Sequence, residues 1–148
     1  MSTDNAPFNA DRLPPVLDAL GIRFRRDADG DAYADWDGLR LWFLTPGEQN
    51  EILAMRALWD FRPPIELYEP MLATLNDWNA GRFWPRASAA VRNERVVVAA
   101  DLVIDLEPGV TDEFIAHQVR CMAGTALEFI EYLTEAYPQY KEWTPTAG

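Results

Sequence analysis

The sequence has very few residues that bind metals or form disulfides: one cysteine, Cys121, and one histidine, His117. One cysteine cannot form an internal disulfide, and a closed metal site needs about four ligands. The sequence therefore excludes a disulfide scaffold and a cysteine-rich metal site, and it is typical of a reducing compartment. It also lacks a glycine-rich phosphate loop, a serine elbow and an HExxH pattern. We accordingly predict no cofactor, no metal and no catalytic residue.

Long hydrophobic runs are missing as well. No apolar stretch approaches the roughly 20 residues that cross a bilayer. The segment Met1–Ala10 has neither the basic region nor the apolar region of a secretion signal. We therefore expect a cytoplasmic protein that does not insert into membranes.

Basic residues are scarce, since 13 lysines and arginines face 24 acidic residues and Lys141 is the only lysine. The net charge of −11 would repel phosphates, whereas nucleic-acid binders draw most of their affinity from basic groups. We expect no nucleic-acid partner. The simplest role of so many acids is to keep the protein in solution, and the alternative is a preference for neutral or basic partners.

The central part of the chain carries the clearest structural pattern. Apolar residues alternate through Phe83–Val91 and again through Val96–Leu106, which predicts two half-buried strands joined by a turn at Arg92-Asn93-Glu94. Thr111 then caps a long amphipathic helix whose apolar face continues to Leu133. This hairpin and helix would form much of a hydrophobic core.

The rest of the chain predicts two further helices and a strand meander. Asp-Gly pairs, which favour the positive φ of tight turns, separate the strands. Helix propensities would also allow a helix over Glu51–Trp59, but the preceding meander favours a strand there. The expected elements are the helix Asp11–Leu20, the strands Arg23–Asp27, Ala32–Trp36, Leu39–Leu44 and Ile52–Phe61, and the helix Pro70–Ala80. Met1–Phe8 is expected to be a disordered lead-in and Gln139–Gly148 a loose tail, in which the docking of Trp143 stays open.

Together these elements predict an α+β fold, with an antiparallel sheet made of a meander and a hairpin and with three helices mainly on one face. At 148 residues, 49% of them hydrophobic, the chain suffices for one domain. We expect this domain to span residues 1–148, with a folded core from about 11 to 137 and flexible termini.

Two groups of residues invite a chemical interpretation. The acids between Asp27 and Asp35 could suggest a calcium loop, but Ala32 and Gly38 stand where such a loop needs glycine and a bidentate acid. Hairpin turns explain these acids better. His117 and Cys121 are four residues apart on one helix, yet no second His or Cys cluster exists to complete a metal site or a catalytic centre. An enzyme with an unrecognised carboxylate or His/Cys centre remains the alternative hypothesis.

The tryptophans suggest a binding surface, since six exceed what one small core must hide. The second face of the predicted sheet carries Trp84, Ser88, Ala90, Val97, Ala99 and Val103, with Trp42 and Leu44 as further candidates. Exposed apolar patches with aromatic anchors mark partner sites. We predict that Trp42, Trp84, Val97 and Val103 bind a partner, unless a helix or the tail covers them.

Several segments resemble, in order, the YbjN family, and particularly its actinobacterial branch. The similarity is carried by core and turn residues and extends over about Asp11 to Tyr137. The segments are Asp27-Ala28-Asp29-Gly30-Asp31, Ile52-Leu53-Ala54-Met55-Arg56-Ala57, Leu75-Asn76-Asp77-Trp78-Asn79, Phe83-Trp84-Pro85-Arg86-Ala87, Asp101-Leu102-Val103-Ile104-Asp105-Leu106 and Gly109-Val110-Thr111-Asp112.

This resemblance implies a fold and a class of function. Members of the family, sometimes described as bacterial sensory transduction regulators, share the fold of type III secretion chaperones, which are small acidic dimers that bind an extended segment of another protein. The resemblance implies a non-enzymatic, protein- or peptide-binding, chaperone-like or regulatory protein that forms a homodimer. It supplies no catalytic residue, because the family has no agreed catalytic motif.

Overall fold

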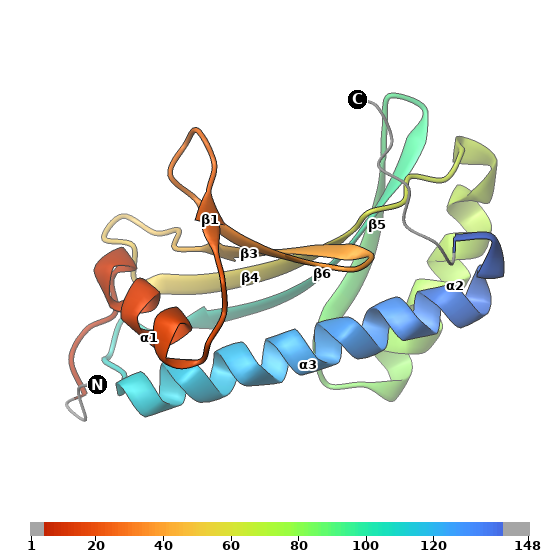
Figure 1. The fold of residues 1–148 in the computed structure, drawn as a ribbon. Coiled ribbons are helices and arrows are strands. Elements are labelled where there is room, and N and C mark those ends of the chain that lie inside the picture. Colours follow the sequence, from red (N-terminus) through yellow and green to blue (C-terminus); the bar gives the residue numbers. More distant parts are fainter. Residues whose placement is uncertain (1–4, 141–148) are drawn as a thin grey trace.

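Six strands form one antiparallel sheet in the order β1-β2-β3-β4-β6-β5 (Figure 1). The structure is a computed structural model and describes residues 5–140. The strands are β1 Arg25–Arg26, β2 Ala32–Trp36, β3 Leu39–Leu44, β4 Ile52–Trp59, β5 Arg86–Arg92 and β6 Arg95–Asp105. The predicted α+β class, with a meander and a hairpin in one sheet, is confirmed.

Three α-helices accompany the sheet within the described part of the chain: α1 Leu13–Ala19, α2 Tyr68–Gly81 and α3 Asp112–Ala136. Helix α3 runs along one face of the sheet and contacts β3, β4 and β6, while α1 packs on α3 and α2 packs against β5 (Figure 1). Short 3-10 helices lie at Ala10–Arg12 (η1), Ile65–Leu67 (η2) and Pro138–Tyr140 (η3). None of the helices within residues 5–140 has the length and apolarity that a membrane span requires.

The turns form where the sequence supplies residues that accept positive φ. Gly30 and Gly38, in the two Asp-Gly pairs, have φ values of 85° and 89°. Asn93 and Glu94 connect β5 to β6 with φ values of 51° and 62°, the conformation of a two-residue hairpin turn. The bounds of β2 and β3 therefore match the prediction.

The core lies between the sheet and α3. Alternate residues of β3 and β4 point toward the helix, as the period-2 pattern predicts, and the apolar stripe of α3 meets them. The largest completely or almost completely buried side chains are Trp78, Phe8, Phe129, Leu17, Leu39, Leu41, Leu53, Met55, Met71, Ile115, Met122 and Leu133.

Three predicted strands are too long at one or both ends. The strand expected over Arg23–Asp27 is reduced to Arg25–Arg26, because the chain first has to cross from α1 to the sheet edge. The strand expected over Ile52–Phe61 ends at Trp59. The strand expected from Phe83 begins only at Arg86, since residues 82–85 connect α2 to β5, and Phe83 is 85% exposed and not on the buried face.

The predictions for the two ends of the chain need correction where the structure describes them. Residues 5–8 are not a disordered lead-in: Phe8 is 2% exposed, and Ala6 forms a β-bridge with Val110. Tyr140 does not belong to a loose tail, because its ring packs on Trp59 and Phe61. Trp143 lies outside the described residues.

Candidate binding surface

The second face of the sheet has no helix of residues 5–140 packed on it, because α3 lies on the other face and α2 packs at the β5 side (Figure 1). We call this surface the open face. Side chains reach it from alternate positions of every long strand. They include Tyr33, Asp35, Arg40, Trp42, Leu44, Ala54, Arg56, Leu58, Arg86, Ser88, Ala90, Val97, Ala99, Asp101 and Val103.

The register of the strands places one row of these side chains across the sheet. Tyr33 on β2 pairs with Trp42 on β3, and Trp42 pairs with Arg56 on β4. Arg56 pairs with Asp101 on β6, and Asp101 pairs with Arg86 on β5. Cross-strand neighbours of this kind are close enough to interact. This row of side chains is therefore aromatic on β2 and β3 and charged on β4, β6 and β5.

Two ion pairs lie on the open face. The guanidinium of Arg56 donates to both carboxylate oxygens of Asp101, with Nε 2.8 Å from Oδ1. Arg40 makes the same bidentate contact with Asp35, also at 2.8 Å. The hydrogen bond to each carboxylate raises the pKa of its arginine. Because the pairs are largely exposed, each contributes about 0–1 kcal/mol to stability, and their main effect is to fix the polar side chains.

The prediction of an apolar surface was therefore incomplete, because it left out these arginines and carboxylates. The pairing of Asp35 with Arg40 follows from the Asp-Gly hairpin, since residues flanking a two-residue turn lie opposite each other. The pairing of Arg56 with Asp101 joins residues 45 positions apart. No local signal in the sequence announces that contact.

Trp42 belongs to a fixed cluster and is half-buried. Its ring lies 5.0 Å from that of Tyr33, and the guanidinium of Arg40 lies 4.1 Å from the centroid of Tyr33 and 5.8 Å from that of Trp42. A cation over aromatic rings is stabilising and also keeps the rings oriented. Trp42 is therefore held at one end of the open face by its own neighbours.

The other predicted partner-binding residues differ in exposure. Val103 on β6 is 60% exposed, and Trp84, two residues before the start of β5, is 42% exposed, with its ring centroid 6.0 Å from that of Phe83 in a tilted arrangement. Val97 is half-buried. At about 3.3 Å per residue, Val97 lies roughly 20 Å along β6 from Val103. The four predicted residues are therefore spread over the surface, and Val103 and Trp84 are the two most exposed of them.

Asp60, just after β4, is the titrating group next to the Arg40–Asp35 pair. Partial burial and the charge of Asp35 raise its pKa to about 6, whereas Arg40 acts in the opposite direction. An aspartate in an unfolded chain titrates near about 3.9. The ionised form of Asp60 is consequently less favourable in the folded protein than in the unfolded chain.

Replacing Asp60 with asparagine is therefore expected to stabilise the protein at neutral pH. The cost of the charge is absent below about pH 4, where both states are protonated, grows between about pH 4 and 6, and is fully present above pH 6. After discounting for solvent screening, we expect Asp60→Asn to raise the free energy of unfolding by about 1 kcal/mol at pH 7.5 and to change little at pH 3.5. Urea denaturation at both pH values measures this. A gain as large for Glu128→Gln, an exposed acid on α3, would point to net charge as the cause.

The acidic segment of residues 27–31 forms the turn between β1 and β2, as the hairpin interpretation predicts. Oδ1 of Asp27 accepts hydrogen bonds from the backbone N–H groups of Asp29, at 3.0 Å, and of Asp31, at 2.9 Å. Aspartates in turns commonly bond to nearby backbone in this way. Within residues 5–140, no group of three or more His, Cys, Asp and Glu side chains could hold a metal ion.

His117 and Cys121 do not form a catalytic centre in the described part of the chain. His117 is exposed on α3 and Cys121 is half-buried. The backbone carbonyl of Cys121 accepts a hydrogen bond from Thr125 Oγ1 at 2.8 Å, and no hydrogen bond joins the thiol to the imidazole among residues 5–140. A nucleophilic pair would need such a bond and a third, orienting group.

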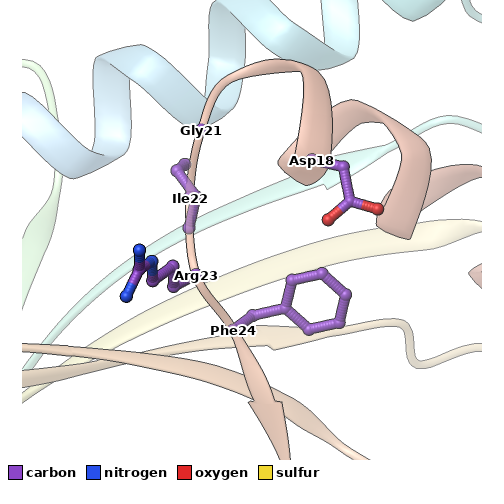
Figure 2. A pocket seen from close by; sticks show the side chains of 5 residues that line it. All are labelled: Asp18, Gly21, Ile22, Arg23 and Phe24. Carbon is purple, nitrogen blue, oxygen red and sulfur yellow. The ribbon is translucent and has the colours of Figure 1, made fainter.

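Two hollows in the described surface also lack the marks of an active site. The larger, of about 460 Å³, lies where the chain passes from α1 to β1 and is lined by Asp18, Gly21, Ile22, Arg23 and Phe24. Figure 2 shows Arg23 turned away from Asp18, so the two charged groups do not converge. The smaller, of about 140 Å³, is lined by Asp37, Gly38, Trp59, Phe61, Ile130, Thr134 and Tyr140. Binding sites for small molecules usually combine an apolar pocket with convergent polar groups.

Comparisons with known proteins identify the family and the fold of the chain. The profile of the YbjN family, described as "Putative bacterial sensory transduction regulator", matches residues 9–135. The fold is similar to a crystal structure described as "YbjN, a putative transcription regulator from E. coli", with a TM-score of 0.72 and 19% sequence identity over 88% of this chain and 94% of that one. A comparison with curated proteins gave no match. At this identity the structural likeness establishes the fold alone.

Proposed function

The chain belongs to the YbjN family, whose members are described as regulators, and from this premise we propose that it regulates by holding an extended segment of another protein. The family description fits a regulatory and non-catalytic role. Capture of a partner segment, in the manner of type III secretion chaperones, is the finer part of the proposal. We also propose that the chain belongs to the actinobacterial branch of the family and acts in the cytoplasm.

The observation that supports binding is the open face itself. A folded domain normally covers the apolar side chains of both faces of a sheet, or makes the second face polar. Here the open face carries the exposed Val103 beside the fixed Arg56–Asp101 pair, and the exposed Trp84 precedes β5, the edge strand of the same sheet. Binding surfaces have this composition, with apolar and aromatic anchors surrounded by polar groups.

The arrangement suits an extended chain better than a compact ligand. Val103 pairs with Ala54 on β4, so a shallow apolar strip lies between the Arg56–Asp101 pair and the end of the sheet. A segment laid on this strip would bury alternate side chains against Val103 and Trp84 and direct its polar side chains toward the ion pair. A second copy of the protein could use the same strip, and we propose a homodimer formed through this face as the resting state.

Replacing the accessible anchors should weaken capture of an unfolded chain more than it weakens folding. We expect Val103→Asp and Trp84→Ala each to reduce the affinity for a fluorescently labelled, permanently unfolded protein by about tenfold or more, because buried anchors dominate binding energy. Fluorescence anisotropy measures the affinity. Leu127→Asp is the matched control: Leu127 is 40% exposed, but it lies on α3 and not on the sheet.

The controls separate capture from self-association and from misfolding. Urea denaturation should place the three variants within about 1 kcal/mol of the wild type, as expected for exposed positions. The proposal fails if the wild type binds no unfolded chain, or if Leu127→Asp weakens binding as much as Val103→Asp does. Light scattering adds the oligomeric state, and a monomeric wild type would remove the homodimer from the proposal.

A further inference from the structure

Strand β5 is the longer of the two edge strands of the sheet, and only the start of its outer edge is occupied. The side-chain amide of Asn79 on α2 binds the backbone of Ala87 twice: Nδ2 donates to the carbonyl oxygen at 3.0 Å, and Oδ1 accepts from the N–H at 2.8 Å. Asn79 thus makes the two hydrogen bonds that a residue of a neighbouring strand would make.

The next two outward-facing residues of β5 have free backbone groups. In an antiparallel ladder alternate residues direct N–H and C=O to the same side, so Ala89 and Val91 face outward as Ala87 does. Among residues 5–140 these groups have no hydrogen-bond partner. Val91 is 41% exposed, and Ala90 and Arg92 are exposed. An exposed edge of this kind can pair with another extended chain.

Helix α2 offers an apolar side chain beside this edge. Residues 82–85 turn the chain back, so that α2 and β5 lie side by side. Leu72 stands seven residues, or two turns, before Asn79 and therefore lies on the same stripe of the helix. Leu72 is 41% exposed. A chain added to β5 would direct alternate side chains toward α2 and could cover Leu72 and Val91.

The segment that carries β5 is basic, although acids such as Asp77 on α2 and Asp101 on β6 lie on the elements packed against it. Residues 82–95 contain four of the 13 basic residues, Arg82, Arg86, Arg92 and Arg95, and one acid, Glu94. None of these arginines pairs with a carboxylate within the described chain. Arg86 donates to the backbone oxygen of Asn79. These arginines without a carboxylate partner among residues 5–140, in a protein of net charge −11, favour an acidic segment at this edge.

We propose that the β5 edge binds an acidic, extended segment of a partner protein as a seventh strand. The inference rests on the proposed function, capture of an extended segment, and assigns its place and chemistry. The segment pairs with Ala89 and Val91, ends at Asn79, covers Leu72, and places carboxylates near Arg92 and Arg86.

A second copy of the chain fits this edge less well. A two-fold axis would make the two β5 strands antiparallel. Pairing through Ala89 and Val91 of both copies would then put each Arg92 opposite Ser88 and diagonal to Arg86 of the other copy. All three side chains lie on the open face. Like charges in neighbouring cross-strand positions are destabilising, whereas an acidic segment neutralises them.

Synthetic peptides test the chemistry of the segment. The probe is a fluorescein-labelled peptide with a central run of alternating valine and threonine and two glutamates at each end. We expect it to bind about tenfold more tightly than the same peptide with lysines in place of the glutamates, and Arg92→Glu to remove or reverse this preference. Methylation of the backbone nitrogens along one side of the probe should weaken binding by about tenfold or more, because it removes the strand-pairing donors.

Ala89→Pro tests the place of binding. Proline removes the outward N–H of Ala89, which the β5–β6 ladder does not use, and edge strands tolerate it. We expect Ala89→Pro to lower the affinity for the glutamate-flanked probe by about tenfold or more. Ala89→Val should keep that affinity within about twofold of the wild type. If proline perturbs folding, the methylated probe with the wild-type protein still decides the matter.

The results also separate this inference from the proposed function. If Val103→Asp weakens capture of the unfolded protein but Ala89→Pro and Arg92→Glu change nothing, the proposed function stands and the β5 inference is wrong. The inference is also wrong if lysine-flanked and glutamate-flanked probes bind equally. It is wrong, too, if Ala89→Pro instead dissociates a homodimer, or if a duplex DNA probe binds through Arg92 in place of the peptide.

Discussion

Trp78→Ala is expected to lower the free energy of unfolding by about 4 kcal/mol, the range for removing a large buried aromatic side chain. Trp78 on α2 is 0% exposed, and its ring contacts those of Phe129, at 5.0 Å, and Tyr132, at 5.3 Å. Its Nε1 donates to the carbonyl oxygen of Pro85 at 3.0 Å. The alanine variant would leave a cavity between α2 and α3 and an unpaired carbonyl ahead of β5. Urea denaturation measures the loss.

Two further variants divide this effect into packing and hydrogen bonding. Trp78→Phe keeps most of the ring but removes Nε1, and it should cost about 1–3 kcal/mol, because the buried carbonyl of Pro85 loses its donor. Leu72→Ala, on the exposed side of the same helix, should cost less than about 1 kcal/mol. A loss for Trp78→Ala no larger than that for Leu72→Ala would mean that α2 does not anchor the start of β5.

The sequence predicts elements well where local residues alone determine them. The bounds of β2 and β3 follow from two Asp-Gly pairs and strict alternation, and Thr111 begins α3 by accepting from the N–H of Phe114, as its position in the sequence indicates. Their physical causes lie within a few neighbouring residues. The same holds for the choice of a strand over Ile52–Trp59, whose alternate residues are buried.

The remaining elements depend on contacts between distant segments. Phe8 looks like part of a polar lead-in, yet it is buried because Ala6 pairs with Val110. The start of β5 is set by α2, through Asn79, and cannot be read from the alternation that begins at Phe83. Periodicity alone cannot show where such a contact ends a strand.

The sequence predicts apolar members of the candidate surface, but neither its ion pairs nor its layout. Alternation correctly assigns Val97 and Val103 to one face of β6, but the exposure of each depends on neighbours that only the folded sheet supplies. The Arg56–Asp101 pair is an example, since its two residues are 45 positions apart in the chain and lie on different strands. The free edge of β5 depends on strand order, which the sequence does not give.

Arg12→Ala is expected to lower the free energy of unfolding by about 2–3 kcal/mol, because hydrogen bonds made by a charged group are worth more than neutral ones. The Arg12 guanidinium donates to the carbonyl oxygens of Ala6, at 2.6 Å, Pro7, at 3.1 Å, and Val110, at 2.8 Å. It also pairs with Asp112 at 2.9 Å, with both side chains largely buried. One side chain therefore holds the N-terminal segment against the start of α3.

The effect of Arg12→Ala should be local as well as global. Hydrogen exchange is expected to show faster exchange of the Val110 N–H, which donates to the Ala6 carbonyl at 2.9 Å, while amides in the middle of α3 change only with global stability. Arg12→Lys keeps the positive charge but lacks the planar set of N–H donors of a guanidinium. It should therefore lose more than half as much free energy of unfolding as Arg12→Ala does. Equal exchange rates of the Val110 N–H in wild type and Arg12→Ala would contradict the inference that Arg12 holds the N-terminal segment against the start of α3.

A second substitution approaches the same contact from the other side. Gly109 has a φ of 115°, and a side chain there would collide with the backbone oxygen of Asn5. Gly109→Ala should therefore strain the backbone and also push the N-terminal segment away. Because Arg12→Ala already releases that segment, the double variant should lose less stability than the sum of the two single losses. Fully additive losses would mean that Arg12 and Gly109 stabilise the fold independently, and that no shared docking of residues 5–9 exists.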